Sequence, residues 1–251
     1  MPSASEPRTH FGFREVPESA KAGLVGEVFS AVASRYDLMN DLMSLGAHRL
    51  WKRFAVLRSG VRRGHRVLDV AAGSGDLAAL FADLVGPAGR VVVTDINPDM
   101  LARGKARLLD RGLLGNVEFA LADAECLEFE ADSFDCVSIA FGLRNVTRME
   151  RALAAMRRVL KPGGRALVLE FSKPVSPALA RLYELYSFNV IPWLGETVAN
   201  DRASYQYLVE SIRRHPEQAA LSAMLRAAGF DEVKVHNLSG GIVALHVGFK
   251  Y

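Results

Sequence analysis

Three aspartates and a glycine-rich turn have the spacing of a nucleotide-binding site. The stretch 67–78, VLDVAAGSGDLA, is an apolar run that meets Asp69 and then becomes rich in glycine. From Gly73 it reads G-S-G-D-L-A, an allowed form of the dinucleotide fingerprint G-x-G-x-x-G/A. Gly73 and Gly75 let the backbone approach a ligand closely, and a following helix would direct its free N–H groups there. We therefore expect a nucleotide at this turn.

The acids around the turn distinguish between two nucleotides. Asp95 ends the next expected strand, where a carboxylate can accept from the ribose hydroxyls of either NAD or S-adenosylmethionine (SAM). Asp69 precedes the glycines, where it would repel a pyrophosphate but could pair with the amino group of SAM. Asp123, in the loop with Ala124 after a third strand, is placed to accept from an adenine N–H. Each aspartate alone could be a helix cap or loop residue, but together they favour SAM.

The elements that would position these residues alternate along the chain. Asn97-Pro98 has the residue types of a helix start, with Asn at the N-cap and Pro at the first position. This alternation is typical of a parallel, doubly wound sheet. The expected strands are 67–70, 90–94, 117–121, 136–141 and 165–171, and the helices between them include 75–84 and 153–160.

The last part of the chain departs from this alternation. After a helix over 219–228, the stretch 231–250 contains two strand-like runs joined by a short Asn/Ser/Gly loop, which predicts an antiparallel hairpin. The fold class we expect is α/β, a Rossmann-like SAM-dependent methyltransferase fold. It would have a mostly parallel seven-stranded sheet, an antiparallel C-terminal hairpin strand, and helices on both faces. Dehydrogenase domains usually stay parallel.

Composition and patterning predict the domain organisation. The 251 residues are half hydrophobic, enough for a sizeable core. Residues 1–20 are polar and contain several Pro and Ser, which predicts a flexible N-terminal arm. Residues 21–251 are expected to form a single methyltransferase domain that begins with a helical cap at 21–60. The connection 174–216 is too long for a simple loop, so we expect it to be a substrate lid.

Other features narrow the class of protein. The net charge of +3 does not require an anionic partner, and no basic run interleaved with aromatics indicates nucleic acid. Cys126 and Cys136 fit no metal or redox spacing, and we expect no metal site. Neither a signal peptide nor an apolar run of membrane-spanning length is found. These features predict a cytoplasmic protein, peripheral at most on the inner face of the membrane.

Two further stretches are too rich in polar and aromatic types to serve packing alone. They are SRYDLMNDLMSLGAHRLWKR at 34–53 and AFGLRNV at 140–146. With DVAAGSGD, RVLKPGG, LEFSKP and NDRASYQYLVESI, they resemble the ubiquinone/menaquinone biosynthesis C-methyltransferases. The resemblance runs from about Thr9 to the last residue. Its most specific parts are YDxMN and FGLRN, whereas the glycine loop alone is a weak signal.

The resemblance implies methylation by SAM of a ring carbon on a polyprenylated benzoquinol or naphthoquinol. It carries Ser74, Asp95, Asp123, Ala124 and Ala140 over as cofactor-binding positions, beside Asp69, Gly73 and Gly75. The family often has Thr where Ser74 stands, so the hydroxyl is kept. It often has Ser where Ala140 stands, so a contact there would have to be through the main chain.

The chemistry of ring methylation gives roles to the polar residues of these stretches. A ring carbon becomes nucleophilic when a neighbouring hydroxyl loses its proton, and a cation beside that oxygen stabilises the phenolate. Arg144 would supply that charge, Asn145 a hydrogen bond, and Tyr36 a wall for the ring. His48 and Asp201 are candidate general bases. The structural alternatives are that Arg144 pairs with an acid and that His48 caps a helix.

Several alternatives stay open from the sequence. The substrate could be another small hydroxyaromatic. The protein could also belong to another class, as a nicotinamide oxidoreductase or as a SAM-binding module without catalytic activity. Expected partners are the prenylated quinol, a membrane surface contacted transiently, and a second copy or a biosynthetic complex. The sequence does not choose between the benzoquinol and the naphthoquinol, and it fixes neither the prenyl length nor the oligomeric state.

Overall fold

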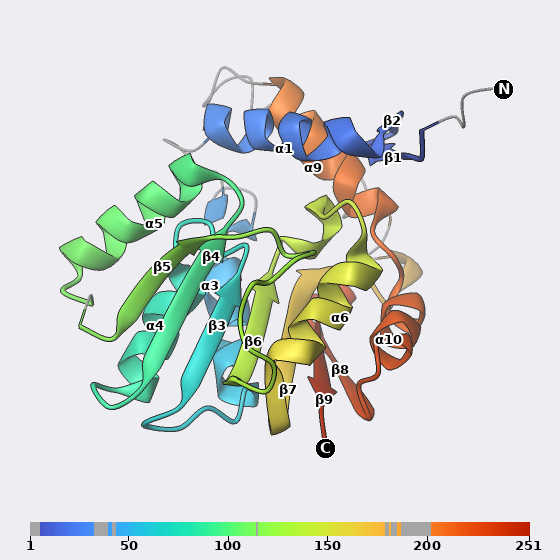
Figure 1. Cartoon of the computed structure of the whole chain (residues 1–251). Helices are drawn as coiled ribbons and strands as arrows, with labels where there is room; N and C mark the ends of the chain where they lie inside the picture. Colours follow the sequence, from blue (N-terminus) through green and yellow to red (C-terminus); the bar gives the residue numbers. More distant parts are fainter. Residues whose placement is uncertain are drawn as a thin grey trace, which may run out of the picture.

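A seven-stranded sheet forms the centre of the protein (Figure 1). The computed structural model describes residues 6–32, 40–41, 44–113, 115–178, 181, 185–186 and 202–251. The strands lie in the order β5-β4-β3-β6-β7-β9-β8. Their bounds are β3 Arg66–Val70, β4 Arg90–Asp95, β5 Val117–Leu121, β6 Phe134–Ala140, β7 Leu160–Phe171, β8 Glu232–Leu238 and β9 Val243–Phe249.

The strand directions confirm the expected fold class. The pairs β4–β5, β3–β4, β3–β6 and β6–β7 are parallel, whereas β9 runs antiparallel to both of its neighbours, β7 and β8. Several boundaries differ from expectation by one to five residues. The largest difference is at β7, which begins at Leu160 and not at residue 165. The helix predicted to reach residue 160 therefore ends at Val159, because Leu160 already pairs with Phe134.

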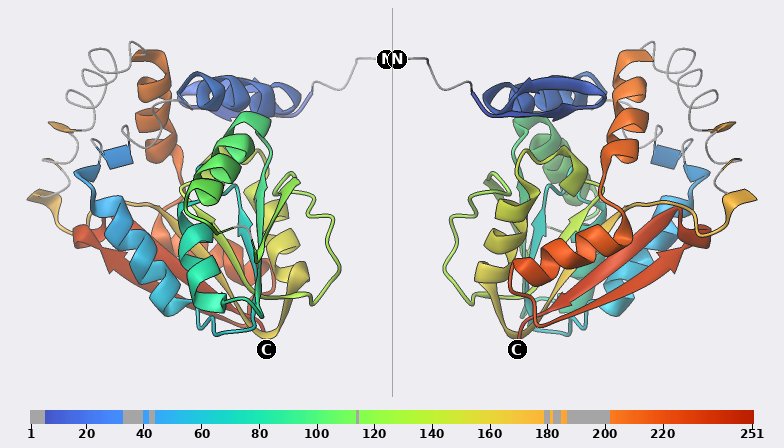
Figure 2. Two further views of the ribbon diagram at one scale, coloured as in Figure 1. Left: turned by 90° about the vertical axis from the view of Figure 1, so that its left-hand side faces the viewer. Right: turned by 90° about the vertical axis from the view of Figure 1, so that its right-hand side faces the viewer.

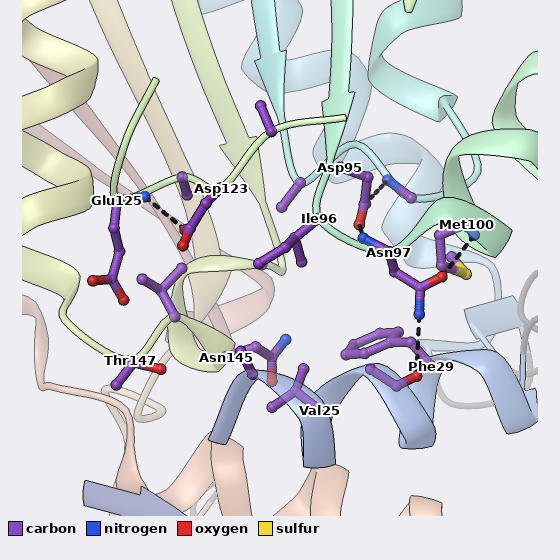
Figure 3. Close-up of a pocket in the computed structure, with 18 of the residues that line it drawn as sticks. Val25, Phe29, Asp95, Ile96, Asn97, Met100, Asp123, Glu125, Asn145 and Thr147 are labelled. Carbon is purple, nitrogen blue, oxygen red and sulfur yellow. Dashed lines mark hydrogen bonds between the residues drawn. The ribbon is translucent and has the colours of Figure 1, made fainter. Parts of the chain in front are cut away.

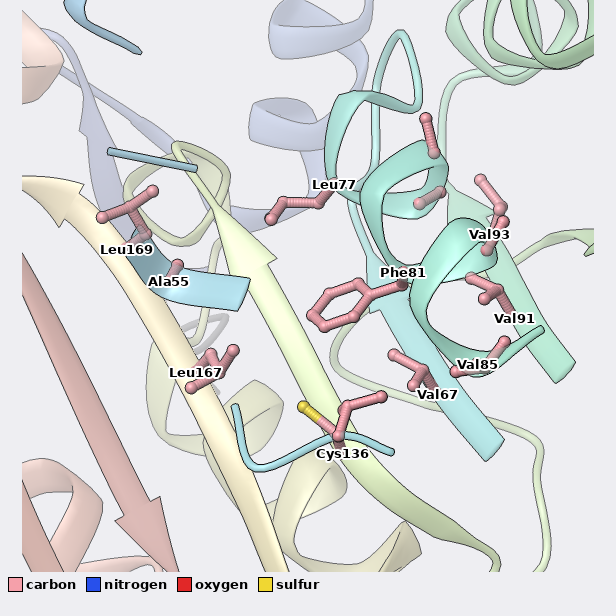
Figure 4. Close-up of a cluster of buried hydrophobic side chains, with 14 of the residues drawn as sticks. Ala55, Val67, Leu77, Phe81, Val85, Val91, Val93, Cys136, Leu167 and Leu169 are labelled. Carbon is pink, nitrogen blue, oxygen red and sulfur yellow. The ribbon is translucent and has the colours of Figure 1, made fainter. Parts of the chain in front are cut away.

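Helices cover both faces of the sheet, as predicted (Figure 2). Alternate residues of a strand point to opposite faces, so Val67 and Leu68 of β3 belong to different hydrophobic clusters. The first cluster packs under α3 (Ala47–Arg58) and α4 (Asp76–Val85), where Phe81 lies among strand side chains (Figure 4). The second packs under α6 (Met149–Val159) and α10 (Gln218–Ala227). Both hydrophobic faces of the sheet are therefore buried.

A separate layer lies across the carboxyl ends of the strands. It contains α1 (Glu18–Val32), α9 (Arg202–Arg214) and the hairpin β1 (Arg8–Phe11) and β2 (Arg14–Pro17) (Figure 1). Residues 8–17, expected within a flexible arm, thus form paired strands. Phe11 stacks on Tyr207 of α9 with the ring centroids 4.2 Å apart. This aromatic contact holds the hairpin against α9.

The expected lid at 174–216 is only partly within the described residues, and α9 is its regular element. Among the helices that the structure describes, none combines the length and apolar character needed to cross a bilayer.

Candidate active site

A pocket opens at the carboxyl ends of β3, β4, β5 and β6, with α1 as its outer wall (Figure 3). The chain connects β3 to β4 on one side and returns to β6 on the other, and ligands of open α/β sheets bind where the strand order reverses in this way. We call this the first pocket. It is lined by Ala22, Val25, Gly26, Phe29, Ala71, Gly73, Asp95, Ile96, Asn97, Met100, Ala122, Asp123, Ala124, Glu125, Ala140, Phe141, Gly142, Asn145, Val146 and Thr147.

Asp95 ends β4 and is fixed by backbone donors. Its Oδ2 accepts from the N–H of Gly73 at 2.9 Å, and its Oδ1 accepts from the N–H of Asn97 at the same distance. Burial raises the pKa of Asp95, although these hydrogen bonds act in the opposite direction. A carboxylate has about four lone-pair sites, so Asp95 keeps acceptor capacity for ribose hydroxyls in the pocket that it lines.

The glycine turn is held against α5 (Pro98–Asp110) by a residue that the sequence analysis missed. Gly75 is the N-cap of α4 and has φ 75°, a conformation that favours glycine. A Cβ on Gly104 of α5 would lie 2.8 Å from the carbonyl oxygen of Gly73. Only glycine therefore fits at position 104 without a shift of backbone. A glycine in the middle of an amphipathic helix was the available signal.

The other predicted adenosine contacts also line the first pocket. Asp123 follows β5, and its Oδ1 accepts from the N–H of Glu125 at 2.9 Å (Figure 3). Ala124 and Ala140 line the same cavity. Asn97 caps α5, as predicted, by accepting from the N–H groups of Asp99 and Met100. Its amide nitrogen also donates to α1, which fastens the wall of the pocket to the cofactor loop.

A second pocket adjoins the first and shares Ala71, Ala140 and Phe141 with it. It is lined in addition by Lys52, Asp69, Ala72, Ser74, Asp76 and Leu77. Ala71 and Phe141 have φ of 49° and 57°, which is strained for residues other than glycine. Such strain tends to gather at ligand sites.

Asp69 lies on the wall of the second pocket. Its Oδ1 accepts from the hydroxyl of Ser138 on β6 at 2.7 Å, but its Oδ2 is buried without a partner among the described residues. Burial raises the pKa of Asp69 to about 7, although the hydrogen bond from Ser138 and the charge of Lys52 act in the opposite direction. An unpartnered buried carboxylate oxygen has the capacity to accept from a ligand cation, which is the role expected of Asp69 toward the amino group of SAM.

Ser74 is at the same turn, but its hydroxyl has a protein partner. The guanidinium of Arg107 on α5 donates to Ser74 Oγ at 3.1 Å and also pairs with Asp76 at 2.7 Å. Ser74 lines the second pocket and not the first. In this structure the hydroxyl therefore helps to join the glycine turn to α5.

Arg144, expected beside a phenolate, is paired with an acid in this structure. It is only 6% exposed and lines neither pocket. Its Nη1 lies 3.1 Å and 3.2 Å from the two carboxylate oxygens of Glu170 and also donates to the carbonyl of Phe141. The guanidinium lies over the ring of Phe171, 5.5 Å from its centroid. This is the structural alternative of an arginine paired with an acid.

Asn145 does line the first pocket. It ends the short 3₁₀ turn Leu143–Asn145, and its Oδ1 accepts from the hydroxyl of Tyr207 on α9 at 2.9 Å. Tyr207 is a second residue that the sequence analysis did not single out, although it lies within the quoted segment NDRASYQYLVESI. No local pattern pairs it with a residue 62 positions earlier.

Of the remaining candidates, His48 lines neither pocket. His48 is buried near the start of α3, where its Nε2 lies 2.8 Å from Asp41. Burial lowers the pKa of His48, although the hydrogen bond to Asp41 opposes the shift. Tyr36 and Asp201 lie outside the described residues.

Comparison with known proteins identifies the family. The model of the ubiE/COQ5 methyltransferase family matches residues 15–250. The chain belongs to the ubiE/COQ5 methyltransferase family. It is 60% identical over 248 residues to the ubiquinone/menaquinone biosynthesis C-methyltransferase UbiE of Pseudomonas fluorescens (strain SBW25), covering 99% of this chain and 97% of that protein. Identity to the UbiE protein of Pseudomonas aeruginosa (strain LESB58) is 61% over 246 residues, covering 98% and 96%.

Solved structures agree on the fold of this ubiE/COQ5 family member. A SAM-dependent methyltransferase from Thermotoga maritima, described as a possible histamine N-methyltransferase, matches with a TM-score of 0.62 at 20% identity, covering 90% of this chain and 99% of that one. One from Aquifex aeolicus matches with a TM-score of 0.59 at 16% identity, covering 84% and 96%. The family and fold together make the protein a SAM-dependent methyltransferase.

Proposed function

We propose that the protein methylates a ring carbon of a polyprenylated quinol in ubiquinone or menaquinone biosynthesis, with SAM as methyl donor. The observation that carries this proposal is that Asn145, from the FGLRN segment, lines the same pocket as Asp95 and Asp123. A residue for the ring and residues for the adenosine thus share one cavity. The names of the relatives support the choice of quinones as products.

In the proposed reaction the protein orients the quinol and keeps water away. SAM, held by Asp95 and Asp123, would supply a methyl group to the ring carbon and leave as S-adenosylhomocysteine, and the proton displaced from that carbon would pass to solvent. Asn145 would donate a hydrogen bond to the ring oxygen and so stabilise the phenolate from which the ring carbon attacks. Because the guanidinium of Arg144 is engaged by Glu170, we assign it the positioning of the turn that carries Asn145. Holding two reactants in the correct orientation can lower the activation free energy by about 7–11 kcal/mol.

The prenyl tail requires an apolar route out of the site. The segment 174–216 carries many aliphatic and aromatic residues, among them Leu179, Leu182 and Phe188, and we assign it that role from its sequence. Tyr36, in YDLMN, retains its proposed role beside the ring.

A prenylated substrate also places the enzyme near a membrane surface. Leu50 and Leu57 are exposed on the outer side of α3, with the exposed Arg53 between them in sequence. Residues seven apart lie on one face of a helix, and cationic and apolar side chains together suit an anionic lipid surface. We assign this outer face of α3 a transient contact with anionic lipid.

The test is methylation with labelled SAM and each reduced quinol, the prenylated benzoquinol and the prenylated naphthoquinol, with product mass as the readout. One or both should gain a single methyl group. The oxidised quinones should be inert when reductant is rigorously absent, because only the quinol has a phenol to deprotonate. Turnover of quinone at the same rate would contradict the phenolate mechanism.

A binding experiment tests the cofactor separately. Calorimetry should show binding of SAM and its demethylated product, S-adenosylhomocysteine, and no binding of NAD. Asp95→Ala should weaken SAM binding by about 1–3 kcal/mol, because a charged acceptor is lost. Asp110→Ala, an exposed acid at the end of α5, serves as the control and should bind SAM normally.

A further inference from the structure

The second pocket is where the amino-acid part of the cofactor would extend. With adenosine held by Asp123 and Asp95 in the first pocket, the remainder of the molecule continues past the shared residues Ala71, Ala140 and Phe141. The methionine part of SAM is a zwitterion, with an ammonium and a carboxylate on one carbon. A fitting pocket must offer both charges.

The second pocket does offer both. Asp69 provides the buried, unpartnered carboxylate oxygen described above. Lys52 is the cation among the lining residues. It projects from α3, is 8% exposed, and its Nζ donates to Asp76 Oδ2 at 2.6 Å. An ammonium carries three donors, and among the described residues Asp76 is the one acceptor of Lys52, so donors are left for a second anion.

Asp76 has a second cation partner besides Lys52. Arg107 pairs with its other oxygen at 2.7 Å. Burial acts to raise the pKa of Asp76, but the adjacent Lys52 and Arg107 hold it below its ordinary value, so Asp76 is ionised. Asp76 is also the first residue of α4, whose free N–H groups favour an anion nearby. A ligand carboxylate at this point would therefore lie near a buried ammonium and a helix N-terminus.

We propose that Lys52 binds the α-carboxylate of the cofactor while Asp69 binds its α-ammonium. This assignment rests on the proposed use of SAM. It gives α3, a helix outside the glycine-turn motif, a direct part in cofactor selection. The pair would distinguish SAM and S-adenosylhomocysteine from nucleosides that lack the amino acid.

The experiment compares two ligands that differ in this group alone. S-adenosylhomocysteine carries the amino acid, and 5′-methylthioadenosine ends in a methyl group at the same sulfur. Each is titrated calorimetrically into wild type and Lys52→Met, which keeps the length and apolar stem of the side chain. S-adenosylhomocysteine should bind roughly 10- to 100-fold more weakly to the variant, because a hydrogen bond between charged groups is lost. The affinity for 5′-methylthioadenosine should stay within about twofold of wild type.

Three further variants complete the test. Lys52→Arg should recover part of the affinity for S-adenosylhomocysteine, since it keeps the charge. Lys105→Met, on the exposed side of α5, should change neither ligand. Lys52→Gln repeats the comparison should Lys52→Met not fold.

The outcomes separate the two levels of the proposal. Equal loss of both ligands would show that Lys52 acts on the glycine turn through Asp76 and would overturn the assignment, as would undiminished binding of S-adenosylhomocysteine. Failure of wild type to bind either SAM or S-adenosylhomocysteine would overturn the proposed function itself. Selective loss of the amino-acid ligand supports both.

Discussion

The hydroxyl of Tyr207 and the side-chain oxygen of Asn145 are joined by a hydrogen bond of 2.9 Å. Burial raises the pKa of Tyr207 to about 12, so the hydroxyl keeps its proton and acts as the donor. With Oδ1 engaged, the amide nitrogen of Asn145 is the group directed toward the first pocket (Figure 3). Tyr207 therefore determines that Asn145 presents a donor to the substrate.

Removing this hydroxyl should slow methyl transfer without disturbing the cofactor. For Tyr207→Phe we expect a loss of about 1 kcal/mol, or roughly fivefold in single-turnover rate, with SAM affinity unchanged by calorimetry. Tyr251→Phe, at an exposed tyrosine distant from the pocket, is the matched control and should be normal. If adding Tyr207→Phe to Asn145→Ala slowed the reaction by a further fivefold, the two residues would be acting independently.

Arg144 and Glu170 should behave as one structural unit. Arg144→Ala leaves a buried carboxylate without its cation, so we expect unfolding free energy to fall by about 3–5 kcal/mol in denaturant titrations. Combining Arg144→Met with Glu170→Gln removes both charges and should restore most of the stability and, with it, most of the rate. A double variant that is stable but inactive would instead assign the guanidinium a direct action on the substrate.

The raised pKa of Asp69 predicts proton release when SAM binds. Near pH 6.5 a carboxyl with a pKa of about 7 is partly protonated, and pairing with the cofactor ammonium favours its ionised form. SAM affinity should therefore rise with pH through about 7 and level off above it. The calorimetric enthalpy at pH 6.5 should vary with the ionisation enthalpy of the buffer, and Asp69→Asn should remove that variation. A wild-type affinity independent of pH between 6 and 8 would exclude Asp69 as the ammonium partner.

The same pKa has a consequence for the ligand-free protein. In the unfolded chain the carboxyl ionises near its ordinary pKa of 3.8, and in the folded protein only near 7. Between these values the unfolded state binds fewer protons, so stability falls as pH rises. The contribution is complete below about pH 4 and lost above about pH 7. Asp69→Asn should flatten this part of the stability profile.

Gly104→Ala should disturb the glycine turn of the cofactor site, although residue 104 lies on the neighbouring helix α5. The added methyl would meet the backbone of the glycine turn, so either α5 or the turn must move. We expect a loss of about 1–3 kcal/mol in stability and weaker SAM binding. Gly23→Ala is the matched control, because that helical glycine has open space around it. It should be neutral or slightly stabilising, and a similar result for Gly104→Ala would contradict the close approach.

The outer face of α3 should bind anionic vesicles. In sedimentation with vesicles of phosphatidylglycerol, Leu50→Glu combined with Leu57→Glu should reduce the bound fraction several-fold, since apolar area is lost and like charge is added. Leu109→Glu tests an exposed leucine on α5, 59% accessible compared with 65% for Leu50. Equal losses for the two variants would indicate a non-specific charge effect.

Structural features that depend on consecutive residues could be predicted from the sequence. The strand boundaries around Asp69 and Asp95, the cap at Asn97 and the final hairpin follow from local apolar periodicity and turn residues. The gathering of Asp95, Asp123 and Ala124 at one pocket followed as well, because the carboxyl ends of parallel strands meet at one edge.

Contacts between distant residues could not be predicted. Three hydrogen bonds depend on how the helices and turns pack at the edge of the sheet. They run from Lys52 to Asp76, from Tyr207 to Asn145 and from Arg144 to Glu170. The hairpin at 8–17 was missed for the same reason, since its support comes from α9 and a short polar segment has little periodicity of its own. The residue types of a segment indicate whether it will be buried, but they do not indicate which distant side chains it will contact.

The insertion of β9 between β7 and β8 determines the order in which this sheet can assemble. β9 follows every other strand along the chain, yet it supplies both ladders that join β8 to the rest and contributes Val243, Leu245 and Val247 to the core. A nascent chain that stops before residue 243 would leave the edge of β7 unpaired and β8 with no neighbour. An unpaired interior strand is a template for pairing with other chains. Truncated products of this protein should therefore aggregate, and chaperone demand should end only when the last strand is inserted.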